Sequence, residues 1–158
     1  MKYILKLALI LLLITAVVAG LLGFVNDLTK DKIAAINLEK TQTAMKAVVA
    51  DPDNSTFSDA LALSDDMTAA ALAGGGTLTE AYEVQVGGAP AGYALKIVAS
   101  GSQGNITMAV GVSNELKCTG ISIISHSETS GLGANAASTA EVGVNFRAQF
   151  VGVDSSVA

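Results

Sequence analysis

The sequence predicts an α+β fold, in which an N-terminal transmembrane helix and a stalk helix precede an antiparallel β-meander packed against helices. Three observations lead to this prediction. Residues 7–25 contain no charged side chain, and residues 26–50 form a helix-like stretch that ends before Pro52. From Glu80 onward, apolar residues recur at every second position between glycine-rich turns. That alternation is typical of strands with one buried face.

The composition excludes several classes of function. The chain has 158 residues and a net charge of −5, so we expect no nucleic-acid partner. The length allows one membrane segment and one domain. Cys118 is the single cysteine, which excludes an internal disulfide, and we interpret it as a buried thiol in a strand. Cys118 and the single histidine do not indicate a metal centre.

The N-terminal segment predicts a membrane anchor over residues 1–25. The uncharged run 7–25 is close to the ~20 residues that a helix needs to cross the hydrocarbon core of a bilayer. A cleaved signal peptide is the alternative, with a possible processing site at residues 17–19. The apolar run continues beyond that site, which favours an uncleaved anchor in membrane lipid. We expect a cytoplasmic N-terminus and an extracytoplasmic domain, because the short N-terminus is too small to be a translocated domain.

Residues 26–52 are predicted to form the stalk, and residues 53–158 the domain. Asn26 or Asp27 could cap the stalk helix, and Pro52 would stop it. Its apolar positions form an incomplete stripe, which we expect to dock on the domain: Leu28, Ile33, Ile36, Met45, Val48 and Val49. Residues 53–79 read as a surface excursion with a short helix near 65–73. Its aspartates lack the spacing of a calcium-binding loop.

Four strands are predicted in the remainder of the domain, over residues 82–86, 93–99, 106–112 and 117–124. Glycine, asparagine and serine turns separate them, as in a meander of antiparallel strands. The apolar face of such a sheet needs a cover. The helical stretches at 26–50 and 134–150 are the candidates.

The fourth strand leads into the candidate site, residues 126–133, His-Ser-Glu-Thr-Ser-Gly-Leu-Gly. Glycines let a backbone approach a ligand closely, and hydroxyl and N–H groups ahead of a helix suit an anion. We expect a helix over about 138–149. The candidate ligand contacts are His126, Glu128, Thr129, Ser130, Gly131, Leu132 and Gly133.

Several of these residues also have a structural interpretation, and Gly131 and Gly133 would serve the backbone conformation in either case. Glu128 could be a surface carboxylate, Thr129 and Ser130 could close a local turn, and His126 could make a structural hydrogen bond. No nucleophile and base can be paired from the sequence, so we assign no catalytic residue.

The stretch Ser-His-Ser-Glu-Thr-Ser-Gly-Leu-Gly-Ala at 125–134 resembles the His-x-Glu-Thr-Pro-Gly-Leu-Gly signature of the FMN-binding domain family, with Ser130 in place of proline. This family includes G subunits of Rnf ferredoxin:NAD⁺ oxidoreductase complexes and C subunits of Na⁺-translocating NADH:quinone reductases. The N-terminal helix, the 92–111 hairpin and Phe146-x-x-Gln149-Phe150-x-Gly152 agree with the resemblance.

The resemblance implies FMN as the cofactor, held by the residues of the 126–133 loop. It also implies a function as an electron-transfer subunit of an ion-translocating, Rnf-type membrane complex. The partners would be the other membrane subunits of that complex.

One family feature is missing from the sequence. FMN-binding domains of this family carry a Ser/Thr-Gly-Ala-Thr motif after the Gln-Phe-x-Gly segment, and its second threonine holds FMN through a phosphoester bond. Residues 153–158 do not contain this motif. We therefore expect a longer protein whose covalent attachment site is not in this sequence. Non-covalent FMN, or a membrane-anchored, cofactor-free binding or assembly module, are the alternatives.

Overall fold

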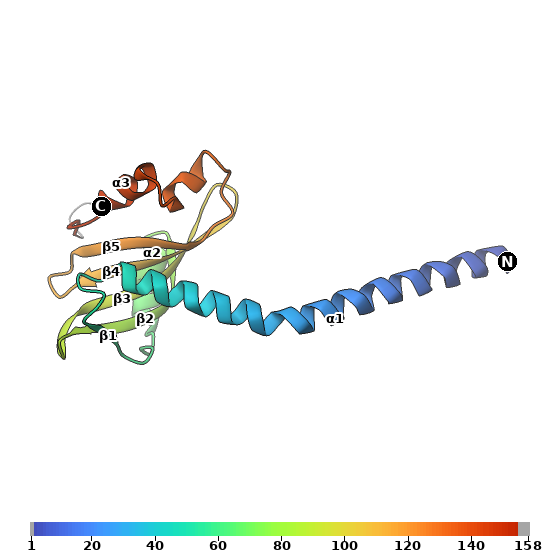
Figure 1. Ribbon diagram of the computed structural model, residues 1–158, viewed down its shortest axis with the longest axis horizontal. Coiled ribbons are helices and arrows are strands. Elements are labelled where there is room, and N and C mark those ends of the chain that lie inside the picture. Colours follow the sequence, from blue (N-terminus) through green and yellow to red (C-terminus); the bar gives the residue numbers. More distant parts are fainter. Residues whose placement is uncertain (1, 155–158) are drawn as a thin grey trace. The chain divides into compact units, whose positions relative to one another are not determined.

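A computed structural model describes residues 2–154 of the chain (Figure 1). The expectation about the attachment motif concerns residues 153–158, of which 155–158 lie outside the described residues. The chain divides into two units, residues 1–39 and residues 40–158. Helix α1, Lys2–Ala47, runs through the first unit and into the second. The predicted anchor and stalk are therefore one continuous helix, which ends before the predicted stop at Pro52.

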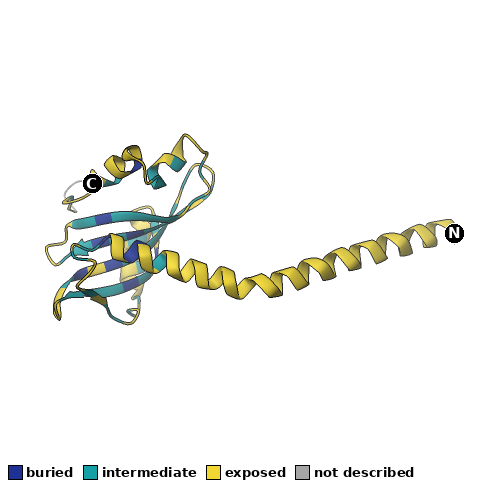
Figure 2. Cartoon of the chain, viewed as in Figure 1, coloured by how far each residue is buried: buried dark blue, intermediate teal, exposed yellow. Residues whose placement is uncertain are grey.

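In the first unit, α1 is exposed along its whole length (Figure 2). By length and composition, it is the one helix among the described residues that could cross a membrane. Leu28, Ile33 and Ile36 lie in this first unit and are exposed there, so the docking of this part of the predicted stripe stays a prediction. Met45 and Val48, at the other end of the stripe, are buried in the second unit.

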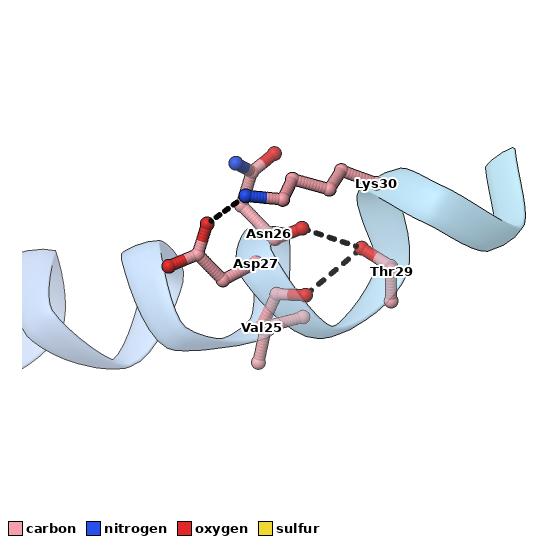
Figure 3. A network of polar contacts seen from close by, with 5 residues as sticks. All are labelled: Val25, Asn26, Asp27, Thr29 and Lys30. Atoms are coloured by element: carbon pink, nitrogen blue, oxygen red, sulfur yellow. Dashed lines mark hydrogen bonds and ion pairs between the residues drawn. The ribbon is translucent and has the colours of Figure 1, made fainter. Parts of the chain in front are cut away.

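Polar residues follow the apolar run without ending the helix (Figure 3). Asp27 pairs with Lys30 at 2.8 Å, one turn further on. The hydroxyl of Thr29 donates to the carbonyl of Val25 at 2.8 Å. These groups are satisfied within the helix, so the cap predicted at Asn26 or Asp27 does not form and the helix continues.

The second unit contains a five-stranded antiparallel sheet in the order β1-β2-β3-β4-β5 (Figure 1). The strands are β1 Ser55–Phe57, β2 Gly76–Val86, β3 Ala89–Ser100, β4 Asn105–Ser113 and β5 Cys118–Ser125. The predicted meander is confirmed, with β1 added at one edge. Gly87 and Gly88 join β2 to β3 with φ angles of 59° and 83°. These positive angles match a tight hairpin turn that favours glycine.

Helix α2, Asp65–Ala73, has the bounds that the sequence predicts and packs against β2. The Ser64 hydroxyl caps it by accepting a hydrogen bond from the Met67 N–H at 3.3 Å. Asp65 and Asp66 lie in its first turn, where negative charge stabilises a helix.

The core lies where the end of α1 meets one face of the sheet. Its buried members are Ala44, Met45, Val48, Val84, Ala94 and Ala109. Ala94 is paired with Gly111, and Gly111 with Gly120, so small residues share this face across β3, β4 and β5. Val48 is fully buried against them. Absent or short side chains let the end of the helix approach the strands closely.

A half-buried charged group lies on the same face of the sheet. Glu80 and Lys96 are direct cross-strand partners, and their side chains pair at 2.7 Å. The hydroxyl of Tyr82 donates to the second carboxylate oxygen of Glu80 at 2.8 Å. Burial raises the pKa of the Glu80 carboxyl, but the bonds from Lys96 and Tyr82 outweigh it and leave that pKa below its ordinary value of 4.5.

Cys118 opens β5 and is half-buried rather than buried as predicted. Burial raises the pKa of its thiol, which keeps it protonated at neutral pH. The Cys118 N–H donates to the Val153 carbonyl, and the Gly152 N–H donates to the Cys118 carbonyl, both at 2.8 Å. The last described residues therefore run beside the start of β5.

Candidate functional site

The 126–133 loop follows β5 directly and folds back on itself. The carbonyl of Thr129 accepts hydrogen bonds from the N–H groups of Leu132 and Ala134, at 3.1 and 3.2 Å. Gly131 has a φ of 77°, which a residue with a side chain rarely adopts. The side-chain amide of Asn135 donates to the Gly131 carbonyl at 3.1 Å. The loop is thus a tight turn with a defined backbone.

Two short helices follow the loop. The first is the 3₁₀ helix η1, Gly133–Ala137, and the second is α3, Glu141–Ala148. The sequence predicts a helix over about 138–149, and the observed helix begins three residues later, at Glu141. The element that adjoins the loop is therefore η1 rather than the N-terminus of α3.

Arg147 ties these two helices together. Its guanidinium donates to the carbonyls of Ala136 and Ser138, the second at 3.0 Å. Gly143 is buried against the carbonyls of Asn135 and Ser138, where a Cβ would have no room. Because η1 begins inside the loop at Gly133, these contacts also fix the end of the loop.

His126 and Glu128 are linked through the backbone. The N–H of Glu128 donates to Nδ1 of His126 at 3.2 Å. Both residues are half-buried. The Glu128 carboxylate does not meet the imidazole; its Oε1 accepts a hydrogen bond from the Gln103 N–H at 3.1 Å.

The middle of the loop carries donors that no other described residue uses. The N–H groups of Thr129, Ser130 and Gly131, and the hydroxyls of Thr129 and Ser130, make no hydrogen bond within residues 2–154. All three residues are exposed, as is Leu132. Clustered N–H and hydroxyl donors fit ligand carbonyl or phosphate oxygens, and the leucine side chain fits an apolar ring face.

The charges of the site limit what it can bind. Residues 126–133 contain no lysine or arginine. Within this loop, an anionic ligand would therefore meet neutral N–H and hydroxyl donors. No cluster of three or more histidine, cysteine or acidic side chains that could hold a metal ion occurs in the described part of the chain.

Sequence reasoning missed the turn between β3 and β4 as part of this site. Thr107 near the start of β4 pairs with Ser125 at the end of β5, so the 101–104 turn and the loop share one end of the sheet. The Gly101 N–H closes that turn by donating to the Gly104 carbonyl at 2.8 Å. The meander predicted from the sequence already places the β3–β4 turn and the segment after β5 at the same end of the sheet. The contact from Gln103 to Glu128 and the role of Arg147 have no sequence signal.

Comparison with known proteins gives matches to two family models and to a relative of known assignment. Residues 1–48 match the RnfG N-terminal region, and residues 101–156 match the FMN-binding domain. The chain is 34% identical over 139 residues to the G subunit of the Na⁺-translocating ferredoxin:NAD⁺ oxidoreductase complex of Acetobacterium woodii. The alignment covers 85% of this chain and 66% of the relative, so the chain spans just under two thirds of that protein's length.

Proposed function

Because this chain is an RnfG-like protein with an FMN-binding domain, we propose that it relays electrons through bound FMN as a subunit of an Rnf-type, ion-translocating membrane complex. Its partners are the other membrane subunits of that complex. The relative from Acetobacterium woodii, a complex subunit by name, supports this assignment.

The observation that carries the proposal is the exposed turn at Thr129–Gly131, with unused donors, inside the region that matches the FMN-binding domain. Thr129, Ser130 and Gly131 would donate to oxygens of FMN. Leu132 would contact an apolar face of the ring, and Gly133 leaves space for the Glu128 side chain. His126 and Glu128 hold the ends of this turn.

FMN supplies one-electron chemistry when it is bound, and the protein supplies binding and orientation. The chain needs no nucleophile or general base for this function. Helix α1 has the length and composition of a membrane anchor, which tethers the domain near its membrane partners. We propose that residues 1–25 are this anchor, that 26–52 form the stalk, and that 53–158 form a domain outside the cytoplasm with the N-terminus inside.

The test is flavin binding by the full chain in detergent. Purified protein is dialysed against FMN, its visible absorbance is recorded, and it is titrated with reductant while electron paramagnetic resonance is followed. We expect stoichiometric FMN and a radical signal at half reduction. Thr129→Ala/Ser130→Ala is expected to weaken FMN binding about tenfold or more, whereas Thr139→Ala, an exposed control, leaves it unchanged.

Two results would contradict the proposal. A chain that takes up no FMN would favour the membrane-anchored, cofactor-free binding or assembly module. Flavin that binds equally well to the Thr129→Ala/Ser130→Ala variant would place FMN elsewhere on the domain.

Parallel titration with riboflavin, which lacks the phosphate, measures how much of the affinity the phosphate supplies.

A further inference from the structure

We propose that Glu128 is a positioning residue, whose carboxylate holds the β3–β4 turn against the 126–133 loop and so sets the conformation that receives FMN. This inference rests on the proposed function. It gives Glu128 a different task from its neighbours: Glu128 organises the loop, and Thr129, Ser130 and Gly131 meet the ligand.

The first contact joins two segments that are distant in sequence. Glu128 Oε1 accepts the N–H of Gln103 at 3.1 Å. The same oxygen lies against Gly101, in the space that a Cβ on that residue would occupy. The turn therefore offers the carboxylate both a donor and a surface without a side chain. A charged acceptor strengthens the bond from the backbone N–H.

The second contact lies within the loop. A Cβ placed on Gly133 would be 2.8 Å from Glu128 Oε2, 2.9 Å from Glu128 Cβ and 3.1 Å from Glu128 Cγ. These are the three nearest atoms to that position, and all belong to one side chain. Gly133 has no positive φ, so its conformation does not require glycine. The glycine is needed there because Glu128 fills the adjacent space.

A third contact also joins the β3–β4 turn to the 126–133 loop. A Cβ on Gly104 would be 3.3 Å from the Cβ of Ser127, the residue before Glu128. Taken with the first two contacts, this means that the Glu128 side chain lies between Gly101 on the turn and Gly133 at the end of the loop. Removing it would free both segments, and residues 129–131 would lose their fixed backbone.

The geometry predicts coupling between Glu128 and Gly133, which a double-mutant cycle measures in FMN affinity. Gly133→Ala forces the Glu128 side chain out of its position, and Glu128→Ala removes it. Each variant is expected to bind FMN about tenfold more weakly, and the double variant no more weakly than either. Gly74→Ala is the control, because its Cβ meets only ordinary contact distances and its φ is −79°.

A second measurement separates positioning from direct ligand contact. Glu128→Gln keeps an oxygen that accepts the Gln103 N–H, so FMN affinity should stay within about threefold of the original protein. Glu128→Ala should accelerate hydrogen exchange at the Gln103 amide in the FMN-free protein. Glu115→Ala, an exposed carboxylate in the β4–β5 turn, should change neither value.

The outcomes distinguish this proposal from the proposed function. Loss of FMN affinity in Glu128→Ala with unchanged Gln103 exchange would show a direct ligand contact and overturn the positioning role. Multiplicative losses in the cycle would overturn it as well. If the original chain binds no FMN, the proposed function fails. The role of Glu128 can still be tested in that case, by hydrogen exchange at Gln103 and by measuring the free energy of unfolding of Glu128→Ala, Gly133→Ala and the double variant.

Discussion

The hydroxyl of Thr119 donates to the carbonyl of Val48, so the residue that directly follows α1 is bonded to β5. Val48 also lies against Gly111 and Gly120, at a point where both neighbouring strands lack a side chain. The strand that holds Val48 continues into the 126–133 loop. The end of α1 and the candidate FMN site are therefore attached to the same strand.

Gly111→Ala should destabilise the domain by about 1–3 kcal/mol, because the added methyl group would overlap the Val48 carbonyl and the Thr119 hydroxyl. Urea unfolding of the full chain in detergent, followed by circular dichroism, measures the change. Gly120→Ala should cost less, since its Cβ would meet Val48 Cα at 3.2 Å. Equal stability of Gly111→Ala and the control Gly74→Ala, whose Cβ meets only ordinary contact distances, would refute this close contact.

Val48→Ala should lower the free energy of unfolding by about 2–3 kcal/mol, from lost burial and the cavity left behind. Val48 is fully buried, in contrast to Val142 on α3, which is 56% exposed. Val142→Ala is the matched control and should change stability by no more than about 0.5 kcal/mol. Similar values for the two variants would mean that the end of α1 does not dock on the sheet.

Arg147→Met should loosen η1, because it removes the Nη1 donor that contacts the carbonyls of both Ala136 and Ser138. Hydrogen exchange measured by mass spectrometry should rise in residues 133–140 and stay unchanged in β2 and β3. FMN affinity should fall as well, since η1 begins at the last loop residue. Unaltered exchange in 133–140 would argue against this role for Arg147.

Glu80→Gln should cost about 0.5 kcal/mol at pH 7, the modest value expected for a partly exposed ion pair. The pKa of Glu80 is lowered in the folded state, so its stabilisation is present above the unfolded value and is lost as the pH falls below 4.5. The difference between the two proteins in urea unfolding should therefore shrink steadily as the pH is lowered from 5 to 3. A difference that stays constant over this range would assign the effect to packing rather than charge.

The regular elements of the fold could be predicted from sequence because local patterns specify them. Alternation and glycine turns locate β2 to β5, and Ser64 with two aspartates marks the start of α2. Three-residue β1 was missed, since a segment this short carries too little pattern to stand out. The stalk cap was predicted wrongly because Asp27 finds its partner, Lys30, inside the helix.

The loop could be located from sequence, but its contacts could not. His-Ser-Glu-Thr-Ser-Gly-Leu-Gly predicts a turn with polar groups, and nothing local tells which of these face a ligand. The bond from Gln103 to Glu128 depends on how two turns meet at one end of the sheet. The glycines at 101 and 133 look like turn residues in the sequence, and their contact with a carboxylate emerges only in three dimensions.

Hydrogen exchange of the full chain, measured with and without saturating FMN, tests most directly whether the 126–133 loop binds FMN. The predicted result is protection of residues 126–133 and of the 101–104 turn, with unchanged exchange in α2 and at the Gly87–Gly88 hairpin. Protection confined to other segments, or exchange that FMN does not alter anywhere, would contradict it.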